Sequence, residues 1–505
     1  MKKSLYIKTY FKQMGLFFRI LTVVSFMLIL TVPAVAQEEL HCATPSELSA
    51  WTEEYLSKRS AFPKNNNLLY VPLSVFIVGT DAGEGYISVQ SVLNALCVLN
   101  QDFAPGNIQF YIQGDIRYIN RSAYYEHSSL SVGFNMQNEF RPINTIGFFI
   151  VSNPAGAAGY ATGIGGNSVV VRKSEMSIGN RTLAHEIGHV LGLYHTFFGW
   201  EGTTYDRNNT TPIRVSNRLV ELVDGSNCQA AGDGFCDTSP DYLSERWDCN
   251  NEGSSTIELR DPQGASFRSD GTNIMSYASD RCVNRFSNEQ LQAMRAHLQG
   301  PKFTFLNRAQ PAPDINTLTS FPIFPGSGET VDVNAVYIEW EPIPGASDYI
   351  LEVSRLGSFP GALTEVYHTK TASITVSNLQ ENRTYHWRVR AYNRNSFCAS
   401  PSPTRTFRTA VMTSVNDLDR KIALNVFPNP VGSDQPLTIQ VNAASSADLV
   451  VRLQDISGRL IRSENYRVAP GASTLQFNPG SVAAGLYLLN FTSDEGSTVR
   501  RIVIR

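Results

Sequence analysis

An eleven-residue stretch, HEIGHVLGLYH, constrains this chain more than any other part of its sequence. His185 and His189 are four residues apart, so on an α-helix their rings project from one face. Two imidazoles placed in this way can hold one Zn²⁺, and Glu186 between them is positioned to act on a zinc-bound water. Gly192 can adopt a left-handed conformation and end the helix, which lets His195 return as a third ligand. Three protein ligands leave the fourth position of a tetrahedral zinc open, as catalysis requires.

The full pattern HExxHxxGxxH is the metzincin signature, which a methionine-containing turn should accompany. The sequence NIMSY at 273–277 supplies that turn. A helix with surface histidines can carry HExxH alone, but the longer pattern recurs by accident only about once per million sites. Met275 is expected beneath the metal as apolar support, and Tyr277 is expected to donate a hydrogen bond to a tetrahedral oxyanion. These residues predict a zinc peptidase site.

Length and composition indicate several folded domains. A chain of 505 residues is too long for one ordinary core, so two to four domains are expected. With 42% hydrophobic and 17% charged residues the chain is typical of folded soluble proteins. A net charge of −3 gives no reason to expect nucleic acid as a partner.

The N-terminus predicts export. Basic residues lie between Lys2 and Arg19, an apolar run covers 20–32, and Ala34-Val35-Ala36 is a small-x-small cleavage site. The apolar run is short for a membrane anchor, which needs roughly 20 residues. Residues 1–36 are therefore predicted to be a signal peptide. A protein that leaves the cytoplasm can form disulfides.

A short polar segment, residues 37–64, follows the cleavage site and is predicted to be a propeptide. Its Cys42 could block the catalytic metal as a thiolate ligand until the segment is removed. The alternatives are a disulfide with Cys97 or Cys398, or an inert thiol. Seven cysteines are an odd number, so at least one has no partner within the chain.

Residues 65–305 are predicted to form an α/β domain. Apolar and alternating runs predict strands near residues 68–78, 108–112, 146–151 and 168–171. Ser88 can cap a helix with apolar residues at helical spacing, and Ser287 begins a capping-box sequence for a closing helix. The glycine-rich stretch 155–166 has the wrong spacing for a phosphate loop, and we expect it to be a flexible rim beside the cleft.

The stretch after the motif, residues 196–272, is irregular and rich in Gly, Asp and Asn. Disulfides and Ca²⁺ help most in such a loop-rich region with little core of its own. Four cysteines permit three pairings, which the sequence cannot resolve, and we favour Cys228 with Cys236 and Cys249 with Cys282. A Cys₄ zinc site is the rival interpretation, although the spacings match no common zinc-ribbon pattern.

Three blocks together resemble the pappalysin family of metzincins. They are HEIGHVLGLYHTF, then GDGFCDTSPD at 232–241, then NIMSYASDRC with FSNEQLQAMR at 286–295. The resemblance covers roughly residues 60–300. It implies a secreted endopeptidase that binds one catalytic zinc and cleaves extracellular or matrix-type proteins. By motif position it assigns zinc to His185, His189 and His195, the general base to Glu186, and the methionine turn to Met275 and Tyr277.

The same resemblance implies three further features. It suggests a structural calcium site, with ligands at Glu221, Asp233, the carbonyl of Cys236, and Thr238. It favours an inhibitory role for Cys42, because family members carry such a cysteine in a short propeptide. Some members also prefer a basic residue after the cleaved bond, which they read with an acid near the cysteine of the methionine turn. Here Asp280 is followed by Arg281, so we do not transfer that preference.

Residues 315–410 resemble a fibronectin type III domain. The segments around Trp340, Tyr349 and Tyr385 alternate between polar and apolar residues and are separated by turn residues. His368 and His386 are isolated and are interpreted as structural. We expect a spacer rather than a specific binding module.

Residues 421–505 follow a polar linker around 413–420 and resemble a C-terminal sorting domain of the type IX secretion system. The resemblance is carried by NVFPNP at 425–430, LQDISGR at 453–459, GLYL at 485–488 and the basic ending RRIVIR. Alternating strands joined by Asn-Pro and Ser-Gly turns predict a small sandwich. One more binding module is the plainer interpretation. The resemblance implies passage through the periplasm and outer membrane, then release or attachment at the cell surface.

The sequence therefore predicts a multidomain protein, with an α/β metzincin zinc-peptidase domain followed by two all-β sandwich domains. Its expected function is hydrolysis of extracellular protein substrates by a zinc-bound water, with proton transfer through Glu186. The secretion machinery is the expected second partner. The alternative is a non-catalytic surface adhesin built on a peptidase fold, although no ligand or base of the site has been lost. A metal-scavenging protein is weaker, because scavenging gives no role to Glu186, Met275 or Tyr277.

Overall fold

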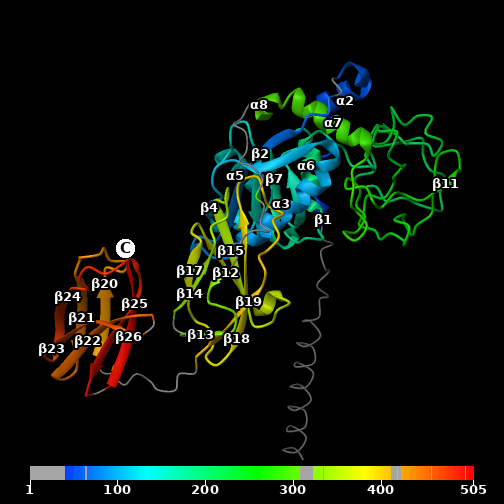
Figure 1. The fold of residues 1–505 in the computed structure, drawn as a ribbon. Coiled ribbons are helices and arrows are strands. Elements are labelled where there is room, and N and C mark those ends of the chain that lie inside the picture. The colour runs from blue at the N-terminus through cyan, green and yellow to red at the C-terminus, as the bar shows by residue number, and fades with distance from the viewer. Residues whose placement is uncertain are drawn as a thin grey trace, which may run out of the picture.

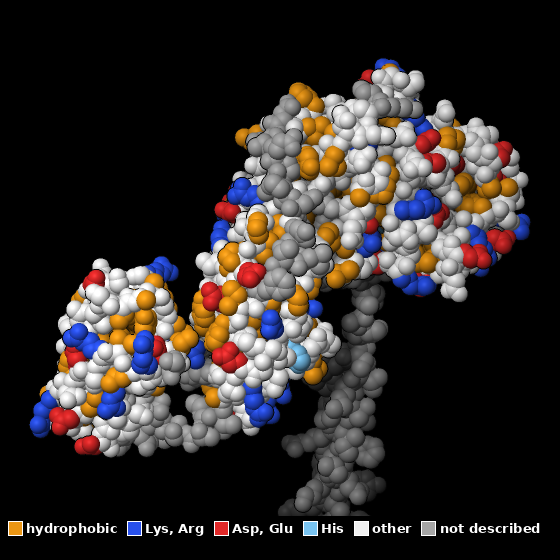
Figure 2. All heavy atoms as spheres, viewed as in Figure 1, with side chains coloured by type: hydrophobic (Ala, Val, Ile, Leu, Met, Phe, Trp, Pro, Cys, Tyr) orange, Lys and Arg blue, Asp and Glu red, His pale blue; other side chains and the backbone are white. Residues whose placement is uncertain are grey.

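An α/β domain is followed by two β-sandwiches (Figure 1). The computed structural model describes residues 40–62, 65–306, 315, 322–331, 333, 335–410, 418, 422–456, 458–494 and 496–505. The predicted signal peptide, 1–36, lies outside these residues, as does the linker around 413–420 apart from Leu418. Among the described residues, no helix is both long and apolar enough to cross a bilayer. On the face drawn in Figure 2, basic and acidic side chains are interspersed over all three domains.

The α/β domain is built on a seven-stranded sheet of order β1-β6-β7-β5-β2-β3, with β4 also pairing with β2. Its strands are β1 (Leu40–Cys42), β2 (Leu69–Gly79), β3 (Ile108–Ile112), β4 (Arg117–Asn120), β5 (Ile146–Val151), β6 (Ala157–Ala161) and β7 (Ser168–Arg172). Only β6 runs antiparallel to its neighbour β7, and the other pairs are parallel. Because helices cover both faces of a mostly parallel sheet, β2 is a nearly continuous buried run.

The helices of the α/β domain are α2 (Ala50–Ser57), α3 (Val89–Phe103), α4 (Ser122–Tyr125), α5 (Leu130–Glu139), α6 (Thr182–Val190), α7 (Asn288–Gln299) and α8 (Phe303–Leu306). The Ser88 side chain caps α3, and Ser287 with Gln290 forms a full capping box on α7. One face of the sheet packs against α3, α6 and α7, and the other packs against α4 and α5.

The glycine-rich stretch is not the flexible rim that the sequence suggests. Residues 157–161 form β6, which lies between β7 and the N-terminal strand β1. Small side chains are needed here, because a Cβ on Gly159 would lie 2.9 Å from Thr182 Cγ2 and 3.1 Å from Glu186 Cγ. The glycine allows β6 to approach α6 closely, so the stretch belongs to the sheet beside the catalytic motif.

The second half of the α/β domain is irregular, as its composition predicts, and Figure 1 shows it as loops beside the sheet around β11. Its strands have two residues each, namely β8 (Arg214–Val215), β9 (Arg218–Leu219), β10 (Leu259–Arg260) and β11 (Ser266–Phe267). Disulfides join Cys228 to Cys236 and Cys249 to Cys282, the same pairing that we favoured from the sequence. These links constrain loops that have few regular hydrogen bonds.

The first sandwich has two sheets, of order β12-β14-β17 and β13-β19-β18-β15-β16. Its strands are β12 (Pro322–Phe324), β13 (Glu329–Val331), β14 (Val336–Trp340), β15 (Asp348–Ser354), β16 (Thr364–Thr369), β17 (Ser373–Val376), β18 (Thr384–Tyr392) and β19 (Arg405–Thr409). Trp340, Leu379 and Tyr385 are all buried in its core. The imidazole of His368 pairs with Asp348.

The last sandwich has sheets of order β20-β21-β24 and β23-β22-β25-β26. Its strands are β20 (Ile422–Phe427), β21 (Leu437–Ala443), β22 (Ala447–Asp455), β23 (Leu460–Val468), β24 (Gly471–Phe477), β25 (Gly485–Ser493) and β26 (Gly496–Ile504). Its apolar core is drawn from residues 418–504 alone.

The first sandwich is joined covalently to the α/β domain. Cys97 on α3 forms a disulfide with Cys398, across a sequence separation of 301 residues. Neither cysteine is therefore a partner of Cys42, which is free and buried, so the disulfide alternative for Cys42 is wrong. The backbone N–H of Ile112 also donates to the carbonyl of Arg394 at 2.8 Å, which covers part of the edge strand β3.

Candidate metal centre

Helix α6 and the turn after it bring three imidazoles together. The Nε2 atom of His189 lies 3.2 Å from Nε2 of His185 and 3.2 Å from Nε2 of His195. Gly192 has φ of +93°, a left-handed conformation that ends the helix and returns the chain toward the first two rings. With Cys42, the three histidines offer ligand atoms that all lie within 4.8 Å of one another.

The other ring nitrogen of each histidine faces an acceptor. Nδ1 lies 2.7 Å from the carbonyl of Ile274 for His185, 2.9 Å from the carbonyl of Leu193 for His189, and 3.1 Å from the carboxylate of Glu201 for His195. A carbonyl or carboxylate accepts only, so each Nδ1 carries the proton and donates it. The three Nε2 atoms therefore present lone pairs to one another, which is the tautomer that a metal ligand needs.

The residues fit a zinc ion. Burial lowers the pKa of His185 to about 3 and holds the pKa of His189 well below its ordinary value, so both rings stay neutral at physiological pH. Three buried lone pairs that converge without a hydrogen between them repel one another unless a cation joins them. Neutral imidazole nitrogens with a sulfur ligand are the donor set that suits Zn²⁺.

Glu186 lies in the same buried space, fully enclosed. Its Oε2 accepts a hydrogen bond of 2.7 Å from the hydroxyl of Thr44, and its Oε1 has no hydrogen-bond partner among the described residues. Burial raises the pKa of Glu186 to about 8, against the opposing hydrogen bonds from Thr44 and Cys42. A cation nearby would favour the carboxylate form.

The N-terminal segment covers this centre as strand β1. Cys42 pairs in register with Gly159 of β6, and the N–H of Ala43 donates to the Gly159 carbonyl at 3.0 Å. This places the Cys42 sulfur 3.6 Å from His189 Nε2 and 3.6 Å from Glu186 Oε2. Burial raises the pKa of the thiol well above its ordinary value. Tyr277 donates a hydrogen bond of 3.2 Å to the carbonyl of Cys42.

The methionine turn lies directly against α6. Met275 is fully buried, and a Cβ on Gly188 would lie 2.5 Å from its sulfur. Glycine at position 188 is therefore what lets the turn approach the helix. The same turn supplies the Ile274 carbonyl that orients His185.

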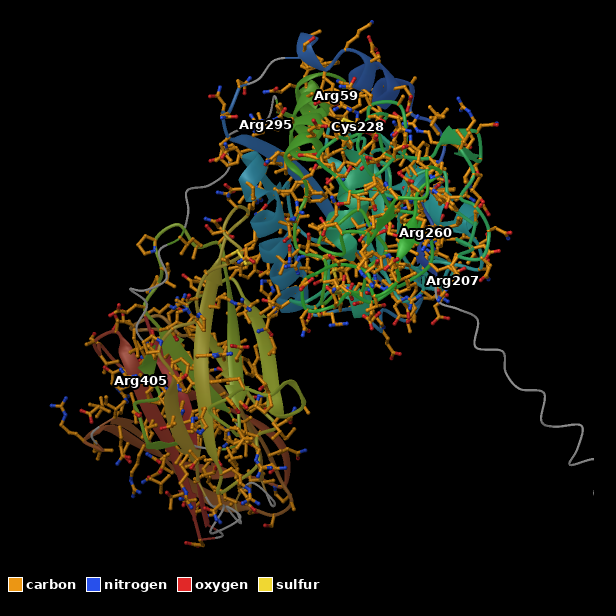
Figure 3. The ribbon with its side chains drawn as sticks, turned by 90° about the vertical axis from the view of Figure 1, so that its right-hand side faces the viewer. Arg59, Arg207, Cys228, Arg260, Arg295 and Arg405 are labelled. Atoms are coloured by element: carbon orange, nitrogen blue, oxygen red, sulfur yellow. A yellow bond between two sulfur atoms is a disulfide. The ribbon has the colours of Figure 1, made fainter. Side chains whose placement is uncertain are left out.

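Further contacts anchor residues 49–59 to the α/β domain. The Thr52 hydroxyl donates to the Gly192 carbonyl at 2.8 Å, and the Trp51 ring stacks on His297 with centroids 4.2 Å apart. Arg59 lies against α7 in Figure 3, where it pairs with Glu289 at 2.6 Å. The segment from β1 to Arg59 is thus packed along one continuous face.

Of the residues suggested as calcium ligands, three are buried and one is exposed. Glu221 and Asp233 are buried, and in the part of the chain that the structure describes each has one carboxylate oxygen without a hydrogen-bond partner. The Thr238 hydroxyl donates to Asp233 at 3.0 Å, whereas Cys236 is exposed and gives its N–H to Glu289. Asp241, which the sequence did not single out, is also buried nearby and acts on the charge of Glu221.

The sequence also did not single out Thr44, Glu201 or Gly188. Glu201 follows the motif by six residues and orients His195, while Thr44 bridges Glu186 and the N–H of Ala161 on β6. Gly188 lies inside the motif, where its role depends on the Met275 contact. A threonine two residues after Cys42 carries no signal of its own, because its role exists only once β1 has paired with β6.

Similar proteins support a peptidase domain with a secretion tail. An extracellular metalloprotease of Pyricularia oryzae is 24% identical over 54% of this chain and 94% of its own length. One from Colletotrichum graminicola is 25% identical over 53% of this chain and 93% of its own length. Residues 425–505 match the family described as secretion system C-terminal sorting domain.

Similarity to solved structures is weak. The FN1–FN3 domains of chicken CNTN1 are 14% identical over 39% of this chain and 68% of theirs, with a TM-score of 0.17. Dimeric latent PorU of Porphyromonas gingivalis is 18% identical over 39% of this chain and 20% of its own length, with a TM-score of 0.18. Scores this low carry no argument about the fold. The chain is therefore similar to extracellular metalloproteases over about half of its length and to secretion sorting domains at its C-terminus.

Proposed function

We propose that this chain is the latent precursor of a secreted zinc endopeptidase of the pappalysin type within the metzincins. The observation that carries the proposal is the convergence of three imidazole Nε2 atoms beside a buried glutamate and a tyrosine hydroxyl. His185, His189 and His195 would hold the zinc. The alternative, a non-catalytic adhesin, is not favoured, because the complete centre would then have no use.

A zinc ion held by these histidines would supply Lewis acidity, which acidifies a water molecule and polarises a peptide carbonyl. The Glu186 carboxylate would take a proton from the attacking water and pass it to the leaving amine. Burial holds the pKa of Tyr277 well above its ordinary value, so its hydroxyl stays protonated and able to donate. The hydrogen bond that it gives to the Cys42 carbonyl is the kind of contact that a substrate carbonyl would receive.

Protein substrates outside the cell are supported by the relatives named extracellular metalloproteases. The match of residues 425–505 to a secretion sorting domain supports export by the type IX machinery through the periplasm and outer membrane. The sorting domain would then be removed or would attach the protein to the surface. Residues 315–410 would form a fibronectin type III domain between the two.

Latency would come from residues 37–64, which we call the prosegment. Cys42 would be a fourth metal ligand, and Thr44 would hold Glu186. Replacing Cys42 by alanine in the full chain should give a precursor that cleaves casein without processing. A Cys42→Ala precursor as inactive as the wild type would remove the cysteine from this role.

A structural calcium ion is also proposed, with Glu221, Asp233 and Thr238 as side-chain ligands and the Cys236 carbonyl as a further oxygen. Unpartnered carboxylate oxygens in a buried place suit a hard cation. The ion would neutralise charges that burial otherwise opposes.

The catalytic proposal is tested with Glu186→Gln after limited trypsin digestion has removed the prosegment. We expect gelatin and casein hydrolysis to fall by about 10²–10⁴ while one zinc per chain is retained, because only the proton acceptor is lost. Glu258→Gln, an exposed acid of the same domain, is the matched control and should keep full activity. Chelator-sensitive hydrolysis by the wild type separates a peptidase from an adhesin. Hydrolysis that survives in Glu186→Gln would refute the mechanism.

A further inference from the structure

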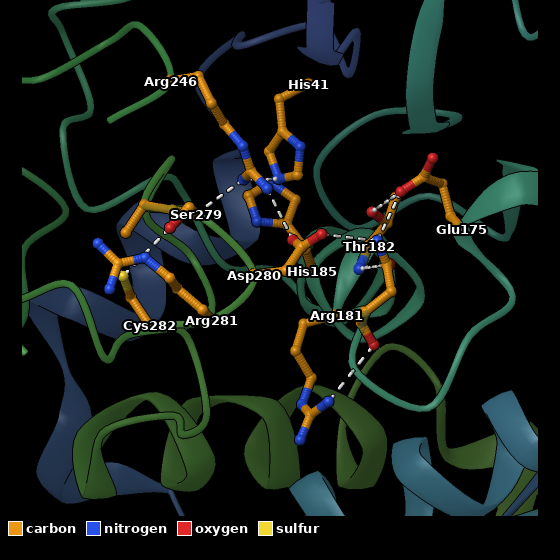
Figure 4. A network of polar contacts seen from close by, with 12 residues as sticks. His41, Glu175, Arg181, Thr182, His185, Arg246, Ser279, Asp280, Arg281 and Cys282 are labelled. Atoms are coloured by element: carbon orange, nitrogen blue, oxygen red, sulfur yellow. Dashed lines mark hydrogen bonds and ion pairs between the residues drawn. The ribbon is translucent and has the colours of Figure 1, made fainter. Parts of the chain in front are cut away.

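Beside the metal centre, a half-buried side chain of the prosegment lies among residues that the catalytic motif does not explain. His41 precedes Cys42 on β1, and its ring lies edge-on to those of His185 and Tyr277, with centroids 5.6 Å and 5.2 Å away. The guanidinium of Arg246 lies on a third side of the His41 ring, and its Nη1 is 3.2 Å from His41 Nε2 (Figure 4). Since a guanidinium only donates, the His41 nitrogen must accept.

Arg246 is held in place from the other side. Its Nη1 donates to the Ala278 carbonyl at 2.7 Å, and its Nη2 pairs with Asp280 at 2.7 Å. The next residue, Trp247, forms backbone hydrogen bonds with Tyr277 of the methionine turn and with Ser279 just after it. The two contacts of Arg246 hold its guanidinium beside His41, although 37% of the Arg246 side chain is exposed to solvent.

The carboxylate of Asp280 pairs with Arg246 and Asn180 rather than with His41. Its Oδ1 accepts from Arg246, and its Oδ2 accepts from the side chain of Asn180 at 3.0 Å. Both oxygens are therefore engaged, and the charge nearest to His41 is positive. A lysine or arginine in the place of His41 would face a guanidinium on one side and the metal centre on the other.

On the basis of the proposed function, we propose that Arg246 determines specificity, and that the site which His41 occupies beside Arg246, His185 and Tyr277 takes a carboxylate side chain of the substrate next to the cleaved bond. Guanidinium and carboxylate can form two parallel charge-assisted hydrogen bonds, which an ammonium or a second guanidinium cannot replace. The substrates are thus extracellular proteins cut beside Asp or Glu. Asp280 acts as a positioning residue, because it reaches the substrate only through Arg246.

The first test uses the full chain and needs no catalysis. Cys42 is the one cysteine outside a disulfide, so its rate of reaction with DTNB reports how firmly β1 is docked. Relative to His41→Gln, we expect His41→Glu to slow the reaction by about tenfold and His41→Lys to speed it by about tenfold. In an Arg246→Ala background the two effects should shrink to less than about twofold or reverse, because Asp280 is then uncovered.

Arg281→Ala is the matched control, since Arg281 pairs with Asp248 rather than facing His41. In this control background the DTNB reaction rates of the three His41 variants should keep their order. Arg246→Gln, which keeps a donor and a similar size, serves if the alanine variant does not fold. The proposal is overturned if the DTNB reaction rates of the three His41 variants keep the same order and the same ratios when Arg246 is replaced.

The second test follows cleavage after prosegment removal. Peptides that differ only in Glu, Gln or Lys on either side of the cleaved bond should be cut in that order of kcat/KM, with about 10–100-fold between Glu and Lys. Arg246→Ala should lower the Glu-to-Lys ratio by at least about tenfold, and an unchanged ratio refutes the assignment. If no peptide is cut at all, the peptidase proposal fails, while the thiol experiment still decides which charge the site beside Arg246 prefers.

Discussion

In β15 every residue from Tyr349 to Ser354 is buried, whereas in β22 burial alternates with exposure along the strand. Both are strands of small sandwiches, so their own cores require only one buried face. In β15 the second face is also covered. Leu351 and Val353 point into the sandwich core, and Ile350 belongs instead to the core of the α/β domain.

Polar contacts also join the first sandwich to the α/β domain. Glu352 of β15 accepts from Gln90 at 2.6 Å, and Arg390 of β18 donates to Asn94 at 3.0 Å, both partners lying on α3. With the Cys97–Cys398 disulfide, these contacts make the first sandwich part of the peptidase body. The last sandwich encloses its own core. Two modules of similar architecture can thus differ in cooperativity. Heating should show two transitions, one for the body, meaning the α/β domain with the first sandwich, and one for the last sandwich.

The largest effect should come from removing the interdomain disulfide. In Cys97→Ser with Cys398→Ser we expect the transition of the body to lose about 3–5 kcal/mol, because this link closes the longest loop in the chain. The transition of the last sandwich should not move. Calorimetry measures both, and Cys228→Ser with Cys236→Ser, which opens an eight-residue separation, should cost less. A shift in both transitions would mean that the two sandwiches unfold together.

A smaller effect should follow from pH in calcium-free buffer. Burial, with the charges of Asp233 and Asp241, raises the pKa of Glu221 to about 9, and burial raises that of Asp233 to about 7. Both folded values exceed the unfolded ones, so these groups stabilise the fold most at low pH, and the gain is lost as pH rises through 7 and then 9.

We expect roughly 2–3 kcal/mol to be lost from the body between pH 7 and 9, and calcium to restore it at the alkaline end. The last sandwich serves as the internal reference, since Thr498 is the one buried polar residue among its described residues. Stability that rises with pH without calcium would contradict the assignment.

A more modest loss is expected at the contact between α3 and the first sandwich. Asn94→Ala removes the acceptor of the Arg390 guanidinium and should cost about 1–2 kcal/mol in the body transition. Asn442→Ala, an exposed asparagine on β21, is the matched control and should stay within about 0.5 kcal/mol. Equal losses in the two variants would argue that the domain contact contributes nothing.

The smallest effect should follow from deleting residues 411–505. Because the last sandwich has a core of its own, the processed enzyme without it should keep kcat/KM within about twofold. The body transition should stay where it was. A fall in either quantity would show that the tail supports the peptidase.

Local patterns predicted the elements that hold the site. Strands at 108–112 and 146–151 coincide with β3 and β5, and Ser88 and Ser287 cap helices as expected. The motif also identified the histidines that the structure brings together, because the i, i+4 spacing of His185 and His189 is set by helix geometry.

What could not be predicted depends on contacts between distant segments. Strand β6 was missed because its Ala and Gly residues have low strand propensity and are selected by the close approach of α6. The Cys97–Cys398 link requires two domains to dock, which no local pattern encodes. The short elements β4 and α4 have only four residues each, too few to show a period.

Strand β1 has a consequence beyond latency, because it is the outermost strand of the sheet. Its departure would leave β6 with an unpaired row of backbone N–H and C=O groups, among them the Gly159 carbonyl that now accepts from Ala43. Such an edge can capture an extended peptide by strand addition, and it can equally join another copy of itself. Removal of the proposed prosegment would therefore create the substrate-binding surface and an aggregation hazard in one step, so the prosegment would also protect the protein during export.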